Sequence, residues 1–174
     1  MYTRIINRAI QSSLVGIKGN TDFQRQRSYD FHAKEFKNEK AVSVEVAHKI
    51  TSMLDDAWSF ETIGLYPEKW KAWEGEGWTL AKNKGAIQLH PALRTISYLC
   101  HEHAHVVVES YRTYYRGGQH LLDKGHGPLW CGVFAYDLSV IIEVPCVDII
   151  EKMRYHGLRV VDEPTITFLR EIIK

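Results

Sequence analysis

A chain of 174 residues is long enough for one domain with a single hydrophobic core. Its 45% hydrophobic and 25% charged residues are typical of a globular protein, and its formal net charge of +1 provides no global attraction to nucleic acid. The three cysteines are scattered and form no C-x-x-C pair, which argues against a disulfide framework and against a cysteine-built zinc site.

The first 20 residues contain no acidic side chain and carry Arg4, Arg8 and Lys18. This composition has some similarity to an organelle transit peptide, but we interpret it as a basic N-terminal arm before a domain at residues 21–174. No apolar run approaches the ~18 residues that span a bilayer. With no sign of a disulfide framework either, we expect a cytoplasmic protein with no membrane partner.

Hydrophobic periodicity predicts the following elements in chain order. Helices are expected at 22–36, 41–58, 92–111, 128–142 and 145–157, with Asp22 as a plausible N-cap of the first. Strands are expected at 59–66, in a hairpin around Asn83-Lys84-Gly85, and at 158–161, while the tail at 165–173 is ambiguous. The sequence therefore predicts one α+β domain, with a small, mostly antiparallel sheet packed on helices.

The stretch LCHEHAHVVVE, residues 99–109, places three histidines and a glutamate in an apolar helix. At about 100° per residue, His101 and His105 share one face with Glu102 beside them, whereas His103 faces the apolar side. In an H-E-x-x-H arrangement of this kind, two imidazoles hold zinc and the glutamate handles a proton. A catalytic zinc usually takes a third protein ligand and leaves the fourth position to water.

The best third ligand is His126 in GHGPLW, 21 positions after His105 and directly before a predicted helix. Its flanking glycines allow the backbone to turn tightly, so that the imidazole can reach the motif helix. Trp130 is expected to pack behind it. His120 is the reserve third ligand, and His103 is expected to stay in the core with a hydrogen-bond acceptor.

Further polar residues are expected around this site. Glu109 and, with weaker support, Asp137 are predicted to orient a ligand imidazole. His32 is interpreted as a solvated or partly packed helix residue, as are His48 and His156.

The stretch SYRTYYRGG forms a dense aromatic and basic cluster beside the proposed cleft. Such side chains can stack on bases, bind phosphate or donate to a developing oxyanion, although they are equally consistent with an ordinary solvated loop. The substrate-binding residues predicted from it are Tyr111, Arg112, Tyr115 and Arg116.

H-E-x-x-H followed by H-G-P-x-W resembles the SprT-like minimal zincins, and more closely a group of small metallohydrolases found in actinobacteria and their phages. In that group a Gln- and Arg-rich helix similar to FQRQRSYDFHAKE precedes the catalytic part. The resemblance covers roughly residues 22–161, and its specific content lies in 101–130. It implies a zincin-like fold with the motif helix at the core, and one Zn²⁺ per chain held by His101, His105 and His126.

The resemblance further implies a zinc-dependent metallopeptidase in the cytoplasm of a bacterium or a phage-infected host, acting on a peptide or protein substrate. Zinc would polarise the scissile carbonyl and lower the pKa of its bound water to about 7, and Glu102 would act as general base. A sheet edge, expected here to be the GAIQLH strand at 85–90, would pair with the extended substrate.

Two alternatives remain. A DNA-linked SprT-like protease is less similar, because the loop between His105 and His126 is longer here and no cysteine-rich zinc ribbon follows. Nucleic acid is accordingly a possible partner but not the favoured one. A binding or regulatory protein with a structural or vestigial zinc site is the other alternative, although such a site has no need of Glu102 as a base.

Overall fold

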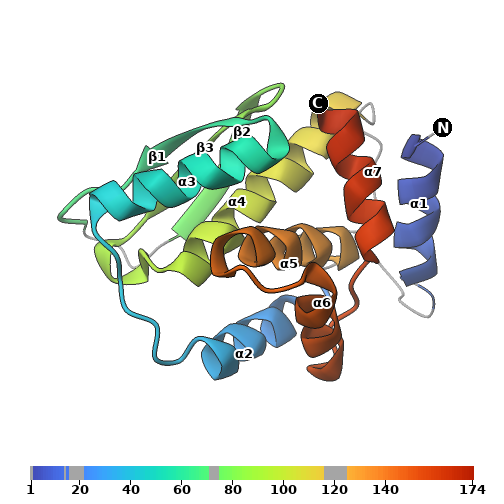
Figure 1. Cartoon of the computed structure of the whole chain (residues 1–174), viewed down its shortest axis with the longest axis horizontal. Coiled ribbons are helices and arrows are strands. Elements are labelled where there is room, and N and C mark those ends of the chain that lie inside the picture. The colour runs from blue at the N-terminus through green and yellow to red at the C-terminus, as the bar shows by residue number, and fades with distance from the viewer. Residues whose placement is uncertain (1, 14, 16–21, 71–74, 116–124) are drawn as a thin grey trace.

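The computed structural model describes residues 2–13, 15, 22–70, 75–115 and 125–174 (Figure 1). The α-helices in these ranges are α1 (Tyr2–Ser13), α2 (Arg25–Glu35), α3 (Val44–Trp58), α4 (Ile96–Ser110), α5 (Pro128–Ile142), α6 (Cys146–Tyr155) and α7 (Glu163–Ile173). The strands are β1 (Glu61–Leu65), β2 (Gly75–Ala81) and β3 (Lys84–Leu89). A 3₁₀-helix, η1 (Pro91–Leu93), precedes α4, and a π-helix, η2 (Tyr111–Tyr115), continues it. The predicted α+β class is confirmed.

The three strands form one sheet in the order β1-β3-β2. β2 and β3 are antiparallel, as the hairpin signal predicts, and Asn83 takes the left-handed conformation of the turn with φ 56°. β1 runs parallel to β3, so the sheet is mixed and the prediction of a mostly antiparallel sheet is wrong. The hairpin could be predicted from its turn residues, whereas β1 pairs with β3 instead of its neighbour in the chain, β2, and no turn residue indicates this pairing.

The helices form layers around the sheet (Figure 1). α4 packs on β2 and β3, α3 packs on β1 and α4, and α5 packs against α4. The core between these layers contains fully buried side chains from three helices, including Trp58, Leu99 and Trp130. Helix α4, which carries the motif, is therefore central, as the sequence predicts. Because it is buried, its side chains are held in fixed positions.

Two terminal segments differ from the simplest interpretation of the sequence. Residues 2–13 of the predicted arm form helix α1, which lies beside α7 with Ile6 and Ile10 fully buried (Figure 1); residues 16–20 lie outside the described residues. Residues 158–161 are not a strand, so that prediction is wrong. The ambiguous tail is helical: α7 begins after Asp162, whose carboxylate accepts a hydrogen bond from Thr165 N at 3.1 Å.

Candidate metal centre

Helix α4 carries His101, Glu102 and His105, and its first turn is well anchored. The Thr95 hydroxyl accepts a hydrogen bond from Tyr98 N at 3.3 Å, which is the interaction of an N-cap residue. The side chains of His101 and Glu102 are buried and His105 is partly buried. A helix fixed in this way places two imidazoles one turn apart on the same face.

His126 reaches the same place from the turn before α5. Gly125 has a positive φ of 57°, and a Cβ at this position would collide with the Asp22 carboxylate. Pro128 is the first residue of α5, where its missing N–H leaves no intrahelical hydrogen bond unmade. The glycine that precedes His126 thus has the conformational role that the sequence assigns to it.

The three predicted histidines converge. One nitrogen from each of His101, His105 and His126 lies within 4.8 Å of the other two, and these buried or partly buried rings are positioned to bind a metal ion. Nε2 of His101 is 3.1 Å from Nε2 of His126. Burial, followed by the charge of neighbouring imidazoles, lowers the pKa of His101 well below its usual value and that of His105 to about 3. Both rings are therefore neutral at pH 7, which is the form that binds metals. His120, the reserve ligand, lies outside the described residues.

Asp22 holds His126 from behind, a contact that the sequence does not predict. Its Oδ2 is 2.7 Å from His126 Nδ1, and its Oδ1 accepts a hydrogen bond from His126 N at 3.0 Å. Burial alone would raise the pKa of the Asp22 carboxyl, but the hydrogen bonds and charge of His126 outweigh it, and the pKa is lowered. An ionised Asp22 accepts the Nδ1 proton, which leaves Nε2 of His126 free to bind a metal.

Gln24 fixes the same segment. It is fully buried, and its amide donates to the carbonyl oxygens of His126 at 2.9 Å and Arg159 at 3.0 Å. Its own Oε1 accepts a hydrogen bond from Arg159 N at 2.5 Å. The backbone beside His126 is thereby tied both to the residues before α2 and to those before α7.

His32 supports His101 in a comparable way. Its Nε2 lies 3.2 Å from His101 Nδ1, and its ring is 5% exposed, so the prediction that His32 is a solvated or partly packed residue is wrong. Burial is the main cause that lowers its pKa to about 4. Because His32 occupies the Nδ1 side of His101, Nε2 is the atom of His101 that is positioned to bind a metal ion.

Trp130 forms the wall behind the histidines, as predicted. Its ring centroid is 4.6 Å from that of His101, 4.6 Å from that of His126 and 5.3 Å from that of His105. The tryptophan itself is fully buried. It therefore restricts the orientation of all three imidazoles and excludes water from their far side.

Glu102 lies next to the histidine cluster, where strand β2 approaches α4 closely. Its Oε1 is 4.0 Å from His101 Nε2. A Cβ on Gly75 would lie 2.9 Å from Glu102 Oε1, and one on Gly77 would collide with the Glu102 carbonyl oxygen. Burial raises the pKa of Glu102 to about 8. The two glycines of β2 thus make room for a buried carboxylate beside the ligands.

Three other predictions around the motif have different outcomes. His103 is buried with Nδ1 2.8 Å from Asp137 Oδ2, as expected of a core histidine with an acceptor. Asp137 also accepts a hydrogen bond from Trp58 Nε1 at 2.6 Å. It is therefore a partner of the core histidine, and its predicted role beside a metal ligand is wrong. Glu109 instead accepts a hydrogen bond from Thr79 N at 3.2 Å, on the surface of β2.

The predicted substrate-binding residues are spread over different surroundings. Tyr111 is fully buried in the core, and the Tyr115 hydroxyl donates to the carbonyl oxygen of Ile173 at 3.0 Å. Arg112 lies close enough to His105 for its positive charge to lower the pKa of that histidine. Arg116 lies outside the described residues. Contact between these side chains and a substrate stays a prediction.

Two tyrosines missed by the sequence analysis flank the cluster instead. The Tyr29 ring lies nearly parallel to His101, at 9° and 6.1 Å between centroids, and meets His126 edge-on at 5.4 Å. The Tyr98 ring is 6.1 Å from His101. Burial raises the pKa of Tyr98, followed by the charges of Tyr29 and Glu102, so the Tyr98 phenol lies near both of these groups.

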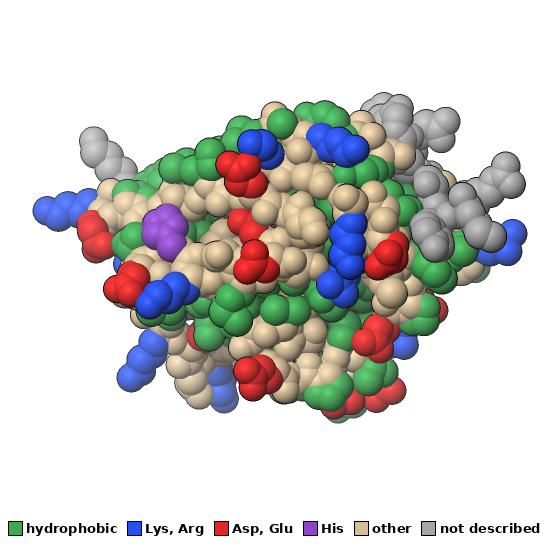
Figure 2. All heavy atoms as spheres, turned by 45° about the horizontal axis from the view of Figure 1, so that its top comes forward, with side chains coloured by type: hydrophobic (Ala, Val, Ile, Leu, Met, Phe, Trp, Pro, Cys, Tyr) green, Lys and Arg blue, Asp and Glu red, His purple; other side chains and the backbone are tan. Residues whose placement is uncertain are grey.

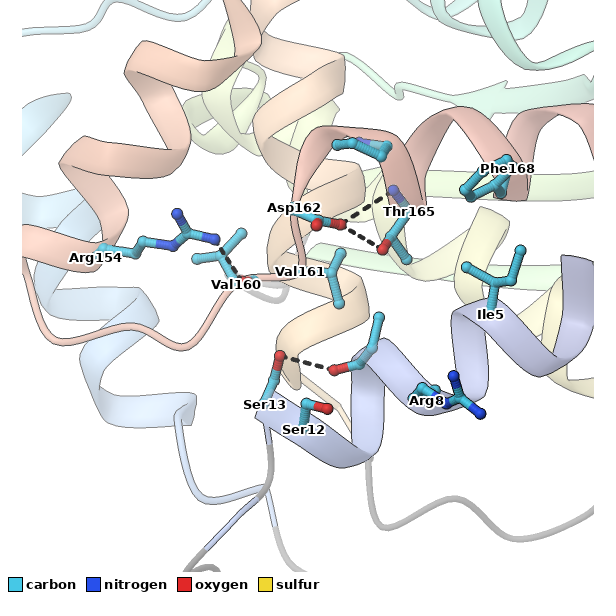
Figure 3. A pocket seen from close by; sticks show the side chains of 12 residues that line it. Ile5, Arg8, Ser12, Ser13, Arg154, Val160, Val161, Asp162, Thr165 and Phe168 are labelled. Atoms are coloured by element: carbon cyan, nitrogen blue, oxygen red, sulfur yellow. Dashed lines mark hydrogen bonds between the residues drawn. The ribbon is translucent and has the colours of Figure 1, made fainter.

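A larger cavity lies away from the histidine cluster. It has a volume of about 800 Å³ and lies between α1, the end of α6 and the start of α7 (Figure 3). Arg8 and Arg154 approach it from different sides, and no residue of the histidine cluster lines it. On the face shown in Figure 2, basic and acidic side chains are interspersed over the described surface.

Comparisons of the chain with family models, curated proteins and solved structures found no match. Within the described residues, none of the helices has both the length and the apolar character needed to cross a membrane.

Proposed function

We propose that this protein is a zinc-dependent hydrolase that cleaves peptide bonds. One observation carries the proposal: a buried carboxylate, Glu102, stands 4.0 Å from a ring nitrogen of a three-histidine cluster. Three imidazoles alone are consistent with any metal-binding role. A carboxylate held beside them, and supplied by the same helix, is the additional group that metal-assisted hydrolysis requires.

The donor set fits zinc. Two nitrogens about 2.0–2.1 Å from one tetrahedral zinc are roughly 3.3 Å apart, which is close to the 3.1 Å between the Nε2 atoms of His101 and His126. Nδ1 of His101 faces His32 and Nδ1 of His126 faces Asp22, so each ring directs Nε2 into the cluster. Within the described residues no other such group of three side chains occurs, which supports one zinc per chain. When bound, zinc supplies a Lewis acid that polarises a carbonyl and acidifies water.

Glu102 has the position of the general base. Its carboxylate is on the same side of α4 as the ligand atom of His101, so it can take a proton from water held there and pass it to a leaving amine. Although burial raises the pKa of this carboxyl, a divalent cation beside it favours the ionised form through its opposite charge. Trp130 keeps solvent away from the other side of the rings.

Strand β2 is the support for an extended substrate. The sequence analysis assigned this role to the GAIQLH segment, but β3 pairs with a strand on each side and is not an edge, so that assignment is wrong. β2 is an edge strand, and its Gly75 approaches the Glu102 carboxylate. Because Thr79 N of β2 already donates to Glu109, a peptide would pair with the part of this edge around Gly75, beside the proposed base.

The proposal is tested by comparing the zinc-loaded protein with Glu102→Gln in a peptide-library cleavage assay. We expect Glu102→Gln to keep one zinc and the native fold and to lose the roughly 10²- to 10⁴-fold that a general base contributes. Glu109→Gln is the matched control, because Glu109 is a carboxylate on the same helix that contacts Thr79 of β2 instead. Equal turnover in Glu102→Gln would remove this residue from the mechanism, and zinc bound without any cleavage by the wild type would favour a structural site.

A further inference from the structure

A cavity of about 420 Å³ opens between α2 and the start of α4. Aromatic rings line it from both elements, namely Tyr29, His32 and Phe36 from α2 and Tyr98 from α4. Its volume is within the range of roughly 300–1,000 Å³ found for small-ligand sites and is ample for one aromatic side chain.

This cavity shares its wall with the metal centre. Three of its rings also face the ligand His101, with centroid distances of 5.0 Å from His32 and 6.1 Å from both Tyr29 and Tyr98. A group in the cavity therefore contacts rings that in turn pack against His101. A substrate that reaches the metal centre can place a neighbouring side chain here.

Glu39, Thr95 and Ser97 of the cavity wall are already engaged in hydrogen bonds within the protein. The Glu39 carboxylate accepts hydrogen bonds from Ser97 N at 3.0 Å and from the Ser97 hydroxyl. The Thr95 hydroxyl accepts the hydrogen bond from Tyr98 N. The rest of the lining consists of the rings of Tyr29, His32, Phe36 and Tyr98, the small side chains of Ala33 and Ala92, and Lys37. Such a wall favours an uncharged aromatic group, which pairs well with other rings.

We propose that this cavity is the specificity pocket of the enzyme and receives an aromatic side chain of the substrate, close to the bond that is cleaved. The inference rests on the proposed peptidase function and adds the substrate class to it. Burying a phenylalanine side chain in place of an alanine is expected to favour the aromatic peptide by roughly ten- to hundredfold in kcat/KM.

The test compares peptides that differ only by phenylalanine or alanine at each position around the cleaved bond. The variant Ala33→Trp fills the cavity from the exposed surface of α2, and Lys34→Trp places the same side chain one position along, outside the cavity. In the wild type we expect a preference for phenylalanine at one position. The ratio of kcat/KM for the phenylalanine peptide to that for the alanine peptide should fall to near one in Ala33→Trp and stay unchanged in Lys34→Trp. The absence of an aromatic preference, or one that Ala33→Trp leaves intact, overturns the proposal.

A binding measurement separates this proposal from the proposed function. Ligand-observed NMR with N-acetyl-phenylalaninamide and N-acetyl-alaninamide is expected to detect binding of the aromatic amide alone, with binding lost in Ala33→Trp and kept in Lys34→Trp. If that pattern holds while no peptide is cleaved, the aromatic site stands and the peptidase function is wrong. If peptides are cleaved without this pattern, the peptidase function stands and the pocket is wrong.

Discussion

Asp22 and His126 are 104 positions apart in the chain, yet the carboxylate of Asp22 faces both Nδ1 and the backbone N–H of His126. The contact sets the tautomer of the ring and the path of the backbone at once. A carboxylate behind a histidine ligand typically raises metal affinity, and its removal costs about 10- to 100-fold. The residues before α2 therefore belong to the candidate metal centre as much as helix α4 does.

Asp22→Asn is predicted to weaken zinc binding by roughly 10- to 100-fold without unfolding the protein, because the amide keeps the size of the side chain but not its charge. Asp30→Asn is the control, since Asp30 is an exposed carboxylate of α2 whose partner is Gln26. Zinc affinity is measured by competition with a chelator. Equal affinities for the two variants would show that Asp22 does not act on the metal.

Zinc content is predicted to be one per chain and to depend on each of the three histidines. His101→Ala, His105→Ala and His126→Ala each remove a nitrogen from the cluster. His48→Ala, which removes an exposed imidazole of α3, is expected to keep the metal. Elemental analysis of zinc-loaded, desalted protein gives the result. Full retention of zinc by His126→Ala would move the third ligand to another residue.

The glycines of β2 are predicted to have different roles. Gly77→Ala brings its Cβ into the backbone of Glu102, so β2 must move away from α4, at a cost of about 1–3 kcal/mol in unfolding free energy. Gly75→Ala meets the ends of two side chains, Leu89 and Glu102, at 2.8 and 2.9 Å. Gly75→Ala is therefore expected to lower the rate of cleavage, by displacing the Glu102 carboxylate, while the free energy of unfolding changes little. Urea unfolding and cleavage assays on both variants test the distinction, which fails if both lose stability equally.

The ion pairs of Glu35 are predicted to stabilise the protein in a pH-dependent way. Contact with Lys152, followed by that with His156, lowers the pKa of Glu35 below its usual 4.5. Between the lowered pKa of the folded state and the usual 4.5, the unfolded chain thus binds more protons than the folded protein. The stabilisation is complete above about pH 4.5 and is lost as pH falls through the folded-state pKa.

Because Glu35 is partly exposed, its ion pairs contribute about 1 kcal/mol or less to the free energy of unfolding. Unfolding free energies of wild type and Glu35→Gln, measured from pH 3 to 7, should differ at pH 7 and converge at low pH. A constant difference across that range would contradict the assignment.

The candidate site residues were predictable because their signal is local. His101, Glu102 and His105 lie within one and a half turns of helix, and His126 is marked by its flanking glycines. The residues that hold these ligands carry no such signal. Asp22 looks like a helix cap and His32 like a surface residue, and their contacts span 104 and 69 positions. A histidine ligand generally needs a carboxylate or carbonyl partner, but the sequence offers 21 acidic residues and no means of choosing among them.

The error at residues 158–161 has a comparable cause. Val160 and Val161 are buried and β-branched, which favours a strand in any local interpretation. In the structure Val161 N donates to the carbonyl oxygen of Pro128 at 3.2 Å, and no ladder follows. Val160 and Val161 cover the start of α5. Only the tertiary arrangement distinguishes such a buried segment from a strand.

The hydrogen bonds of Gln24 also set an order of events during synthesis. Because this side chain joins the backbone at His126 to that at Arg159, the segment that carries Asp22 reaches its final place only after residue 159 has left the ribosome. A nascent chain therefore displays the motif helix, and then His126, before the carboxylate behind His126 is locked in position. We expect a metal ion acquired before that point to be held less tightly, because the backbone at His126 is not yet fixed.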